Sequence, residues 1–178
     1  MDSLYRRIII TLRIIKALLG KKRIYEKVTI RGNEEFINST IKAMELLQEK
    51  APDAYELVQR YIGDIVSGKP SGVFPDMLWL GPTFVIMGPS YSEGGTIEYA
   101  AGIAHEAYHC ELYTKAKKGN LGRRVQPDAY SGEQAEGLCL EYQCGVLRKL
   151  GLEEEVIKEY ESQLHSRWWE VPFERQDW

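Results

Sequence analysis

With 178 residues, 44% of them hydrophobic, the chain is long enough for one domain with a buried core, and its composition excludes a disordered protein. No stretch reaches the roughly 18 uninterrupted apolar residues that a membrane span needs, and no known nucleic-acid-binding motif is present, so a nucleic-acid partner is not expected. The three cysteines have no paired spacing and predict no disulfide framework, which favours a reducing compartment and a cytoplasmic protein.

The first segment, residues 1–23, is basic. Nine lysine and arginine residues fall within the first 31 positions, against Asp2 and Glu26, and the rest of the chain is acidic. The pattern over residues 3–19 predicts a basic amphipathic helix closed by Gly20, although its isoleucine cluster leaves a strand open. We expect this segment to pack on the domain or on a second copy of the chain, as in a homo-oligomer. Peripheral contact with a membrane surface is the alternative.

A single domain is expected over residues 24–164. The alternation of apolar and polar residues over 23–31 predicts a strand. Asn33 is placed to cap the helix that follows, whose first turn is acidic. Pro52 begins a second helix, whose apolar positions run from Tyr55 to Ile65, with Gly63 weakening it. Residues 67–72 form a predicted loop.

Two short strands are predicted before the next helix, at residues 77–80 and 83–87. Beyond them, helices are predicted over 96–118, 132–150 and 152–164, and an aromatic C-terminal tail, residues 165–178, follows. Short strands among longer helices indicate an α+β fold, with a small twisted β-sheet packed on several helices.

The chemistry of the chain centres on residues 105–109, which read His-Glu-Ala-Tyr-His. Residues four apart lie on the same face of a helix, so His105 and His109 can each give a nitrogen to one cation. Glu106 lies about 100° further round the helix, where it can reach a water on that cation. Two imidazoles and one more oxygen or sulfur ligand make an open zinc site, in which such a glutamate acts as general base. Only three histidines occur in the chain, and two of them make this motif.

The third ligand is expected from the following helix, where Glu133, Glu136, Cys139, Glu141 and Cys144 are the candidates. Glu136 is favoured because it falls on an otherwise inward-facing stripe, where an unpaired carboxylate is costly to bury. The other members of that stripe are Cys139, Leu140, Gln143 and Leu147. Gly137 is expected to let the two helices approach closely. The cysteines, Cys110 included, are interpreted as small buried hydrophobic residues, and Glu133 and Glu141 as solvated.

The order of a strand, an H-E-x-x-H helix, a loop and a helix with a Glu-Gly pair resembles the gluzincin clan of zinc metallopeptidases, and the compact form is most similar to the minigluzincins. The resemblance covers residues 24–150, and H-E-x-x-H is its one specific motif. It implies that His105, His109 and Glu136 are zinc ligands and that Glu106 is the base. It also implies that the strand before the motif helix pairs with an extended substrate. The matching residues are Thr83, Phe84, Val85, Ile86 and Met87.

The larger members of the clan place Asn before the ligand Glu and Asp four residues after it, to brace a histidine. Ala135 and Leu140 occupy these positions here, and Glu98 and Glu133 are the carboxylates left for that role. In latent minigluzincins a segment of the chain plugs the cleft, and the aromatic residues 168–178 are the segment expected to do so in this chain.

We therefore expect a zinc-dependent metallopeptidase with Zn²⁺ as its cofactor and a peptide or protein as its substrate. The donor to the developing oxyanion is left open among Tyr108, Arg123, Arg124, Tyr130 and His165. The alternative is a non-catalytic zinc module, structural or regulatory, in which His165 or Cys139 completes a shell of four protein ligands. An adapter that docks through its basic leader on a membrane or nucleic acid is a third hypothesis.

Overall fold

The computed structural model describes residues 12, 15, 19–68, 71–73, 84–87, 95–120 and 125–163. Over these residues the fold is α+β, as expected, with a small mixed sheet packed on helices. The predicted strand at 77–80, most of the basic leader and the aromatic tail lie outside the described residues, so the predictions for them stay predictions.

The chain opens the sheet with a hairpin of β1, Lys21–Tyr25, and β2, Val28–Gly32. The prediction of one strand over 23–31 was wrong, because the chain turns back at Glu26 and Lys27. Glu26 adopts the left-handed conformation, with φ of 49°, that such turns usually give to Gly or Asn. Neither residue type marks the turn, so the alternating pattern runs through it unbroken. β1 begins before the expected domain boundary at residue 24.

Two helices follow the hairpin where the sequence predicts them. α2 spans Glu34–Lys50, and the Asn33 side chain caps it by accepting a hydrogen bond of 2.8 Å from the Phe36 amide. α3 spans Pro52–Tyr61 and begins, as expected, at its proline.

The second helix is shorter than predicted, because the chain leaves it at Ile62 and enters a strand. β3 spans Asp64–Ser67 and was missed. Ile62 has extended backbone angles, and Ile65 faces the core from the strand instead of from the helix. Ile65 continues the helical spacing of the apolar residues of α3, so this spacing could not show that the helix ends and a strand begins. Parallel pairing of β3 with β2 on one side and β5 on the other decided the outcome.

The sheet has the order β1-β2-β3-β5-β4. β4 is Gly72–Val73 and β5 is Phe84–Met87, within the predicted strand at 83–87. β3 pairs with β5 in parallel, and β4 pairs with its other edge in an antiparallel manner at Val85 and Ile86. β5 is therefore an inner strand at Val85 and Ile86, and the pairing of this strand with an extended substrate stays a prediction. Thr83 lies outside the described residues.

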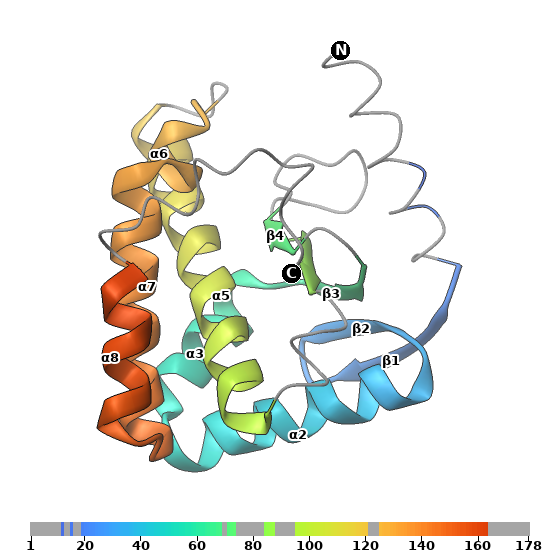
Figure 1. The fold of residues 1–178 in the computed structure, drawn as a ribbon. Coiled ribbons are helices and arrows are strands. Elements are labelled where there is room, and N and C mark those ends of the chain that lie inside the picture. Colours follow the sequence, from blue (N-terminus) through green and yellow to red (C-terminus); the bar gives the residue numbers. More distant parts are fainter. Residues whose placement is uncertain are drawn as a thin grey trace.

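Helices build the other half of the molecule. α5 is Thr96–Gly119, α6 is Asp128–Ser131, α7 is Glu133–Leu150 and α8 is Glu154–Gln163. In Figure 1, α5 stands between the sheet on its right and α7 and α8 on its left, while α2 crosses below. α7 ends at Gly151, which adopts the left-handed conformation, and its N-cap residue, Gly132, provides no side-chain cap.

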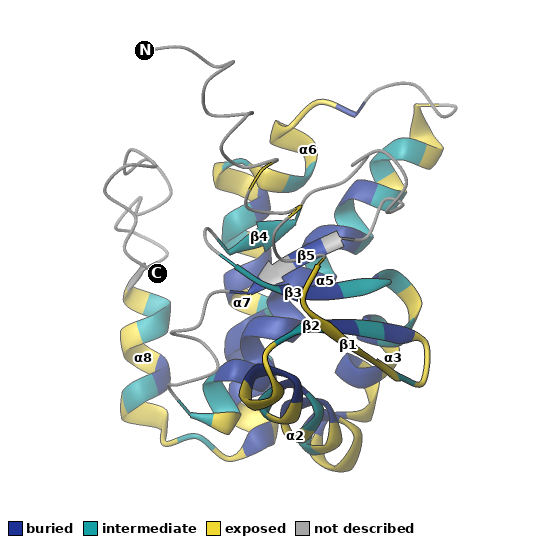
Figure 2. Cartoon of the chain, turned by 90° about the vertical axis from the view of Figure 1, so that its right-hand side faces the viewer, coloured by how far each residue is buried: buried dark blue, intermediate teal, exposed yellow. Residues whose placement is uncertain are grey.

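The core lies around α5. Residues 99–107 of this helix are buried without interruption, because α2, α3 and α7 all pack against it. Thr40 Oγ1 of α2 lies 2.6 Å from the Tyr99 hydroxyl, and this buried hydrogen bond ties the two helices together. Figure 2 shows the contrast between this dark-blue interior and the exposed edge strand β1. Among the described residues, no helix has both the length and the apolar character needed to cross a membrane.

The junction between β2 and α2 provides a test of this packing. A Cβ added at Gly32 would lie 2.7 Å from Phe36 Cδ1 and 3.0 Å from Ser67 Cβ. We expect Gly32→Ala to lower the free energy of unfolding by about 1–3 kcal/mol, because the crowded ring or β3 has to move. Urea unfolding measures the change. Gly119→Ala, where the added carbon meets nothing within 4 Å, is the control; an equal loss there would contradict the steric explanation.

Candidate metal centre

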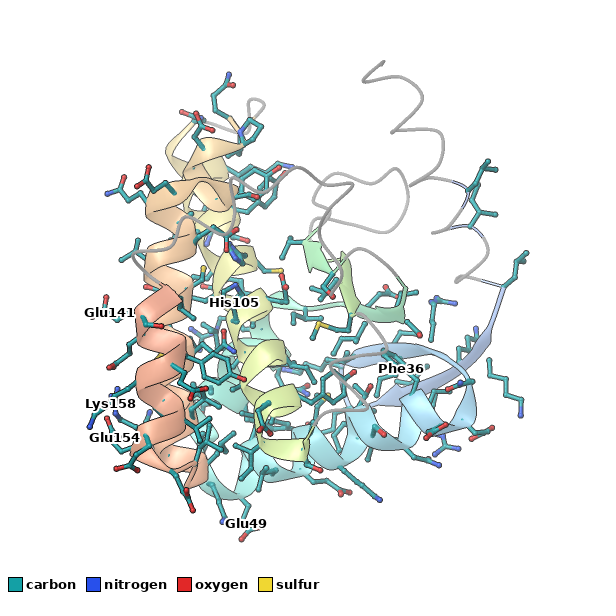
Figure 3. All side chains as sticks on the ribbon, in the orientation of Figure 1. Phe36, Glu49, His105, Glu141, Glu154 and Lys158 are labelled. Carbon is teal, nitrogen blue, oxygen red and sulfur yellow. The ribbon has the colours of Figure 1, made fainter. Side chains whose placement is uncertain are left out.

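The H-E-x-x-H motif lies inside α5, in its buried stretch. His105, Glu106 and His109 are 8%, 7% and 5% exposed. The two ring Nε2 atoms lie 3.0 Å apart, so both imidazoles point at one place, as predicted from their spacing. Figure 3 shows His105 about midway along α5, between α7 and the sheet.

The ring of His109 is oriented by the next element. Its Nδ1 lies 2.6 Å from the Tyr130 carbonyl oxygen of α6, which accepts a hydrogen bond from the Nδ1–H. With the proton on Nδ1, the lone pair of Nε2 is free for a cation, and such backing is usual for metal-binding histidines. Tyr130 was one of five candidates for the oxyanion donor, whereas this contact comes from its main chain. No described group hydrogen-bonds His105 Nδ1, so neither Glu98 nor Glu133 braces that ring.

Glu136 reaches the same place from α7. One carboxylate oxygen, Oε2, lies 3.4 Å from His109 Nε2 and 3.7 Å from His105 Nε2, and the side chain is 13% exposed. The rest of the predicted stripe is buried, whereas Glu133 and Glu141 are exposed, as expected. Thus the structure brings together the three side chains that were singled out as metal ligands.

The electrostatics favour a positive charge among these three groups. Burial raises the pKa of Glu136, but the nearby imidazoles of His105 and His109 outweigh burial and lower the pKa to about 2. Burial lowers the pKa of His109, but contacts with Cys139 and Glu136 outweigh it and raise the pKa well above its usual value. Without a metal, a proton on His109 therefore supplies the charge that the ionised carboxylate requires.

The geometry fits a small metal ion. Ligand atoms held at about 2.0–2.1 Å from zinc, at tetrahedral angles, are about 3.3 Å from one another. The three separations here, 3.0, 3.4 and 3.7 Å, scatter around that value. Glu136 Oε2 is buried and has no hydrogen-bond partner among the described residues, as expected for an atom whose partner is a cation. The donor set of two imidazoles and one carboxylate suits zinc.

Cys139 joins this cluster, which was not the favoured interpretation. It follows Glu136 by three residues on the same face of α7 and is fully buried. Ligand atoms of His105, His109 and Cys139 all lie within 4.8 Å of one another, so these three residues could hold a metal ion. Burial raises the pKa of the Cys139 thiol, while His109 opposes that shift. The sequence feature that could have identified Cys139 as a ligand was the inward-facing stripe of this helix, on which Cys139 lies beside Glu136. Cys110 and Cys144 are buried, as expected.

Glu106 is the buried group that metal binding alone does not explain. Its Oε2 atom has no hydrogen-bond partner among the described residues. Burial raises the pKa of Glu106, and interactions with His105 and His109 oppose that shift. A carboxylate in such a place costs free energy unless a cation, or a water held by one, compensates it. A proton-accepting group next to the ligands can perform general base chemistry.

The remaining site predictions divide in two. Tyr108 is described, and its ring stacks on Tyr142 of α7 with 4.7 Å between the centroids. Arg123, Arg124 and His165 lie outside the described residues. In the expected substrate strand, the side chains of Val85 and Met87 are buried in the core.

Gly137 does not have the role expected of it. A Cβ added there meets nothing within 4 Å, so the close approach of α5 and α7 does not depend on this glycine. We expect Gly137→Ala to raise the free energy of unfolding by about 0.5–1 kcal/mol, because Ala costs less backbone entropy in a helix. Chemical denaturation checks this, with Gly145→Ala, equally open, as the parallel case. A destabilised Gly137→Ala protein beside a stabilised Gly145→Ala protein would restore the close-approach explanation.

Comparisons with known proteins do not extend this description. A scan against family models, a search of curated proteins and a search of solved structures each find no match to the chain.

Proposed function

We propose that the chain is a zinc-dependent metallopeptidase of gluzincin type that hydrolyses peptide bonds in a peptide or protein substrate. The observation that supports this most is Glu106, a buried carboxylate with an unpartnered oxygen on the helix that carries both histidines. A site that only binds metal has no use for it. In a hydrolase it accepts the proton of the attacking water.

Each residue then has one task. His105, His109 and Glu136 would hold the cation, whose chemistry would be to lower the pKa of a water and to polarise the scissile carbonyl. The Tyr130 carbonyl keeps His109 in the tautomer that binds metal. Glu106 takes the proton of the water and passes it to the leaving amine.

The sheet suggests where an extended substrate would lie. β5 is paired on both sides, and β4, which contacts α5, is the last described strand at that edge. A peptide that adds a strand to this sheet would therefore pair with β4, or would have to displace it to reach β5.

A second function is favoured by Cys139. With two histidines, Glu136 and Cys139, the chain offers four donors, which is the ligand number of a structural zinc site. In that case the metal braces α5 against α7 and no cleavage occurs. The two functions differ in what they require of Glu106.

The test is cleavage of a peptide library by the zinc-loaded full chain, followed by mass spectrometry. Wild type and Cys139→Ala are both assayed, so that a sulfur in the fourth position cannot hide the activity. We expect cleavage that chelation removes and added zinc restores. Stoichiometric zinc in both proteins with no cleavage by either would reject the peptidase and leave the structural zinc module.

A further inference from the structure

The arrangement of donors on α5 and α7 is symmetrical in one respect. Each helix supplies two potential ligands, one turn apart: His105 and His109 on α5, and Glu136 and Cys139 on α7. Since α5 and α7 pack along each other, these two pairs meet at one place. The ligand atoms of His105, His109 and Cys139 all lie within 4.8 Å of one another, and Glu136 Oε2 lies 3.4 Å and 3.7 Å from the two histidine Nε2 atoms.

The sulfur of Cys139 lies near the two histidines, because the ligand atoms of the three residues are all within 4.8 Å of one another. The residue is fully buried and is not part of a disulfide. A sulfur at about 2.3 Å from zinc is as ordinary a ligand as an imidazole nitrogen at about 2.0–2.1 Å.

We propose that Cys139 Sγ is the fourth protein ligand of this metal centre and closes it in the resting state. A tetrahedral shell of His105, His109, Glu136 and Cys139 leaves no position for the water that Glu106 would activate. For catalysis, the bond between Cys139 Sγ and the metal would have to break. The released thiolate would take a proton from solvent, and a water would take its place on the metal. The proposal that Cys139 ligates the metal does not depend on the function of the chain. The proposal that this ligation blocks catalysis, here called the cap, rests on the peptidase proposed above.

Cobalt substitution tests the ligation without reference to activity. The full chain is loaded with Co²⁺, and thiolate ligation is read from the intense sulfur-to-cobalt charge-transfer absorption in the near ultraviolet. We expect this band in wild type and in Cys144→Ala, which removes another buried thiol of α7, and its loss in Cys139→Ala. Zinc binding should weaken by more than about 10-fold in Cys139→Ala, since removing even an outer partner of a ligand has that effect.

A measurement on the unaltered protein keeps the proposal testable if Cys139→Ala does not fold. X-ray absorption of the zinc-loaded wild type should show one sulfur at about 2.3 Å from zinc. A zinc shell of nitrogen and oxygen alone, or a cobalt band that persists in Cys139→Ala, overturns the proposal.

The cap and the peptidase fail in different ways. If Cys139 ligates zinc and Cys139→Ala cleaves peptides faster than wild type, both stand. If Cys139 ligates zinc but neither protein cleaves, the ligation stands and the peptidase falls. If zinc has no sulfur ligand and wild type cleaves with dependence on Glu106, the peptidase stands and the cap falls.

Discussion

Glu106→Gln should abolish most peptide cleavage while leaving zinc in place. A glutamine has almost the same shape but cannot accept the proton of the attacking water, and a positioned general base contributes about 10²- to 10⁴-fold to rate. We therefore expect kcat/KM to fall by about that factor, in wild type and in the Cys139→Ala background alike. Zinc content and the unfolding transition should not be reduced, because the substitution replaces a buried, unpartnered carboxylate by a neutral group.

Glu111→Gln is the matched control for this experiment. Glu111 lies on the same helix, where it contacts Lys115 and the Tyr61 hydroxyl and takes no part in the metal centre. Its kcat/KM should stay close to that of the parent. Equal cleavage by the Glu106→Gln protein, with zinc bound, would remove Glu106 from the mechanism and with it the main support for a peptidase.

Removal of the metal should lower the stability of the folded chain strongly. A ligand present at about 1,000 times its dissociation constant stabilises the native state by about 4 kcal/mol. For a domain of this size, each kcal/mol shifts the melting temperature by about 2–4 °C, so chelation should lower it by about 8–16 °C. The physical reason is that Glu136 and the two histidines remain buried together without the cation. Calorimetry with chelator, and again after zinc is restored, measures the effect.

Two substitutions on α7 test whether the effect of chelation depends on Glu136. Glu136→Gln should weaken zinc binding by more than about 10-fold and reduce the chelator-dependent shift, because it removes the charge of a ligand. Glu133→Gln, at an exposed position one turn earlier, should behave as wild type. Identical melting of the zinc-loaded and chelated wild type would show that no tightly bound metal exists. Equal zinc loss in the two variants would show that Glu136 is not a specific ligand.

Local patterns were sufficient for the helical part of the fold. Asn33, Pro52 and Gly151 mark helix ends through side-chain capping, missing amide hydrogens and left-handed backbone, which act within a few residues. The strands were less predictable. The turn at Glu26 carries no turn residue, and Ile65 continues the period of α3 until pairing with β2 and β5 draws it into the sheet.

The candidate site divides along the same line. The amino-acid sequence by itself determined that His105 and His109 share a face of one helix with Glu106 beside them, because a helix has a constant period over a single turn. It also narrowed the donors on the later helix to one stripe, which includes Glu136 and Cys139.

Only the tertiary structure decided which of those donors reach the histidines, that the Tyr130 carbonyl orients His109, and that β4 occupies an edge of β5. These contacts join residues that lie 12 to 34 positions apart in the chain. They depend on how helices and strands pack in space, and the spacing of residues within one helix or strand does not determine this packing.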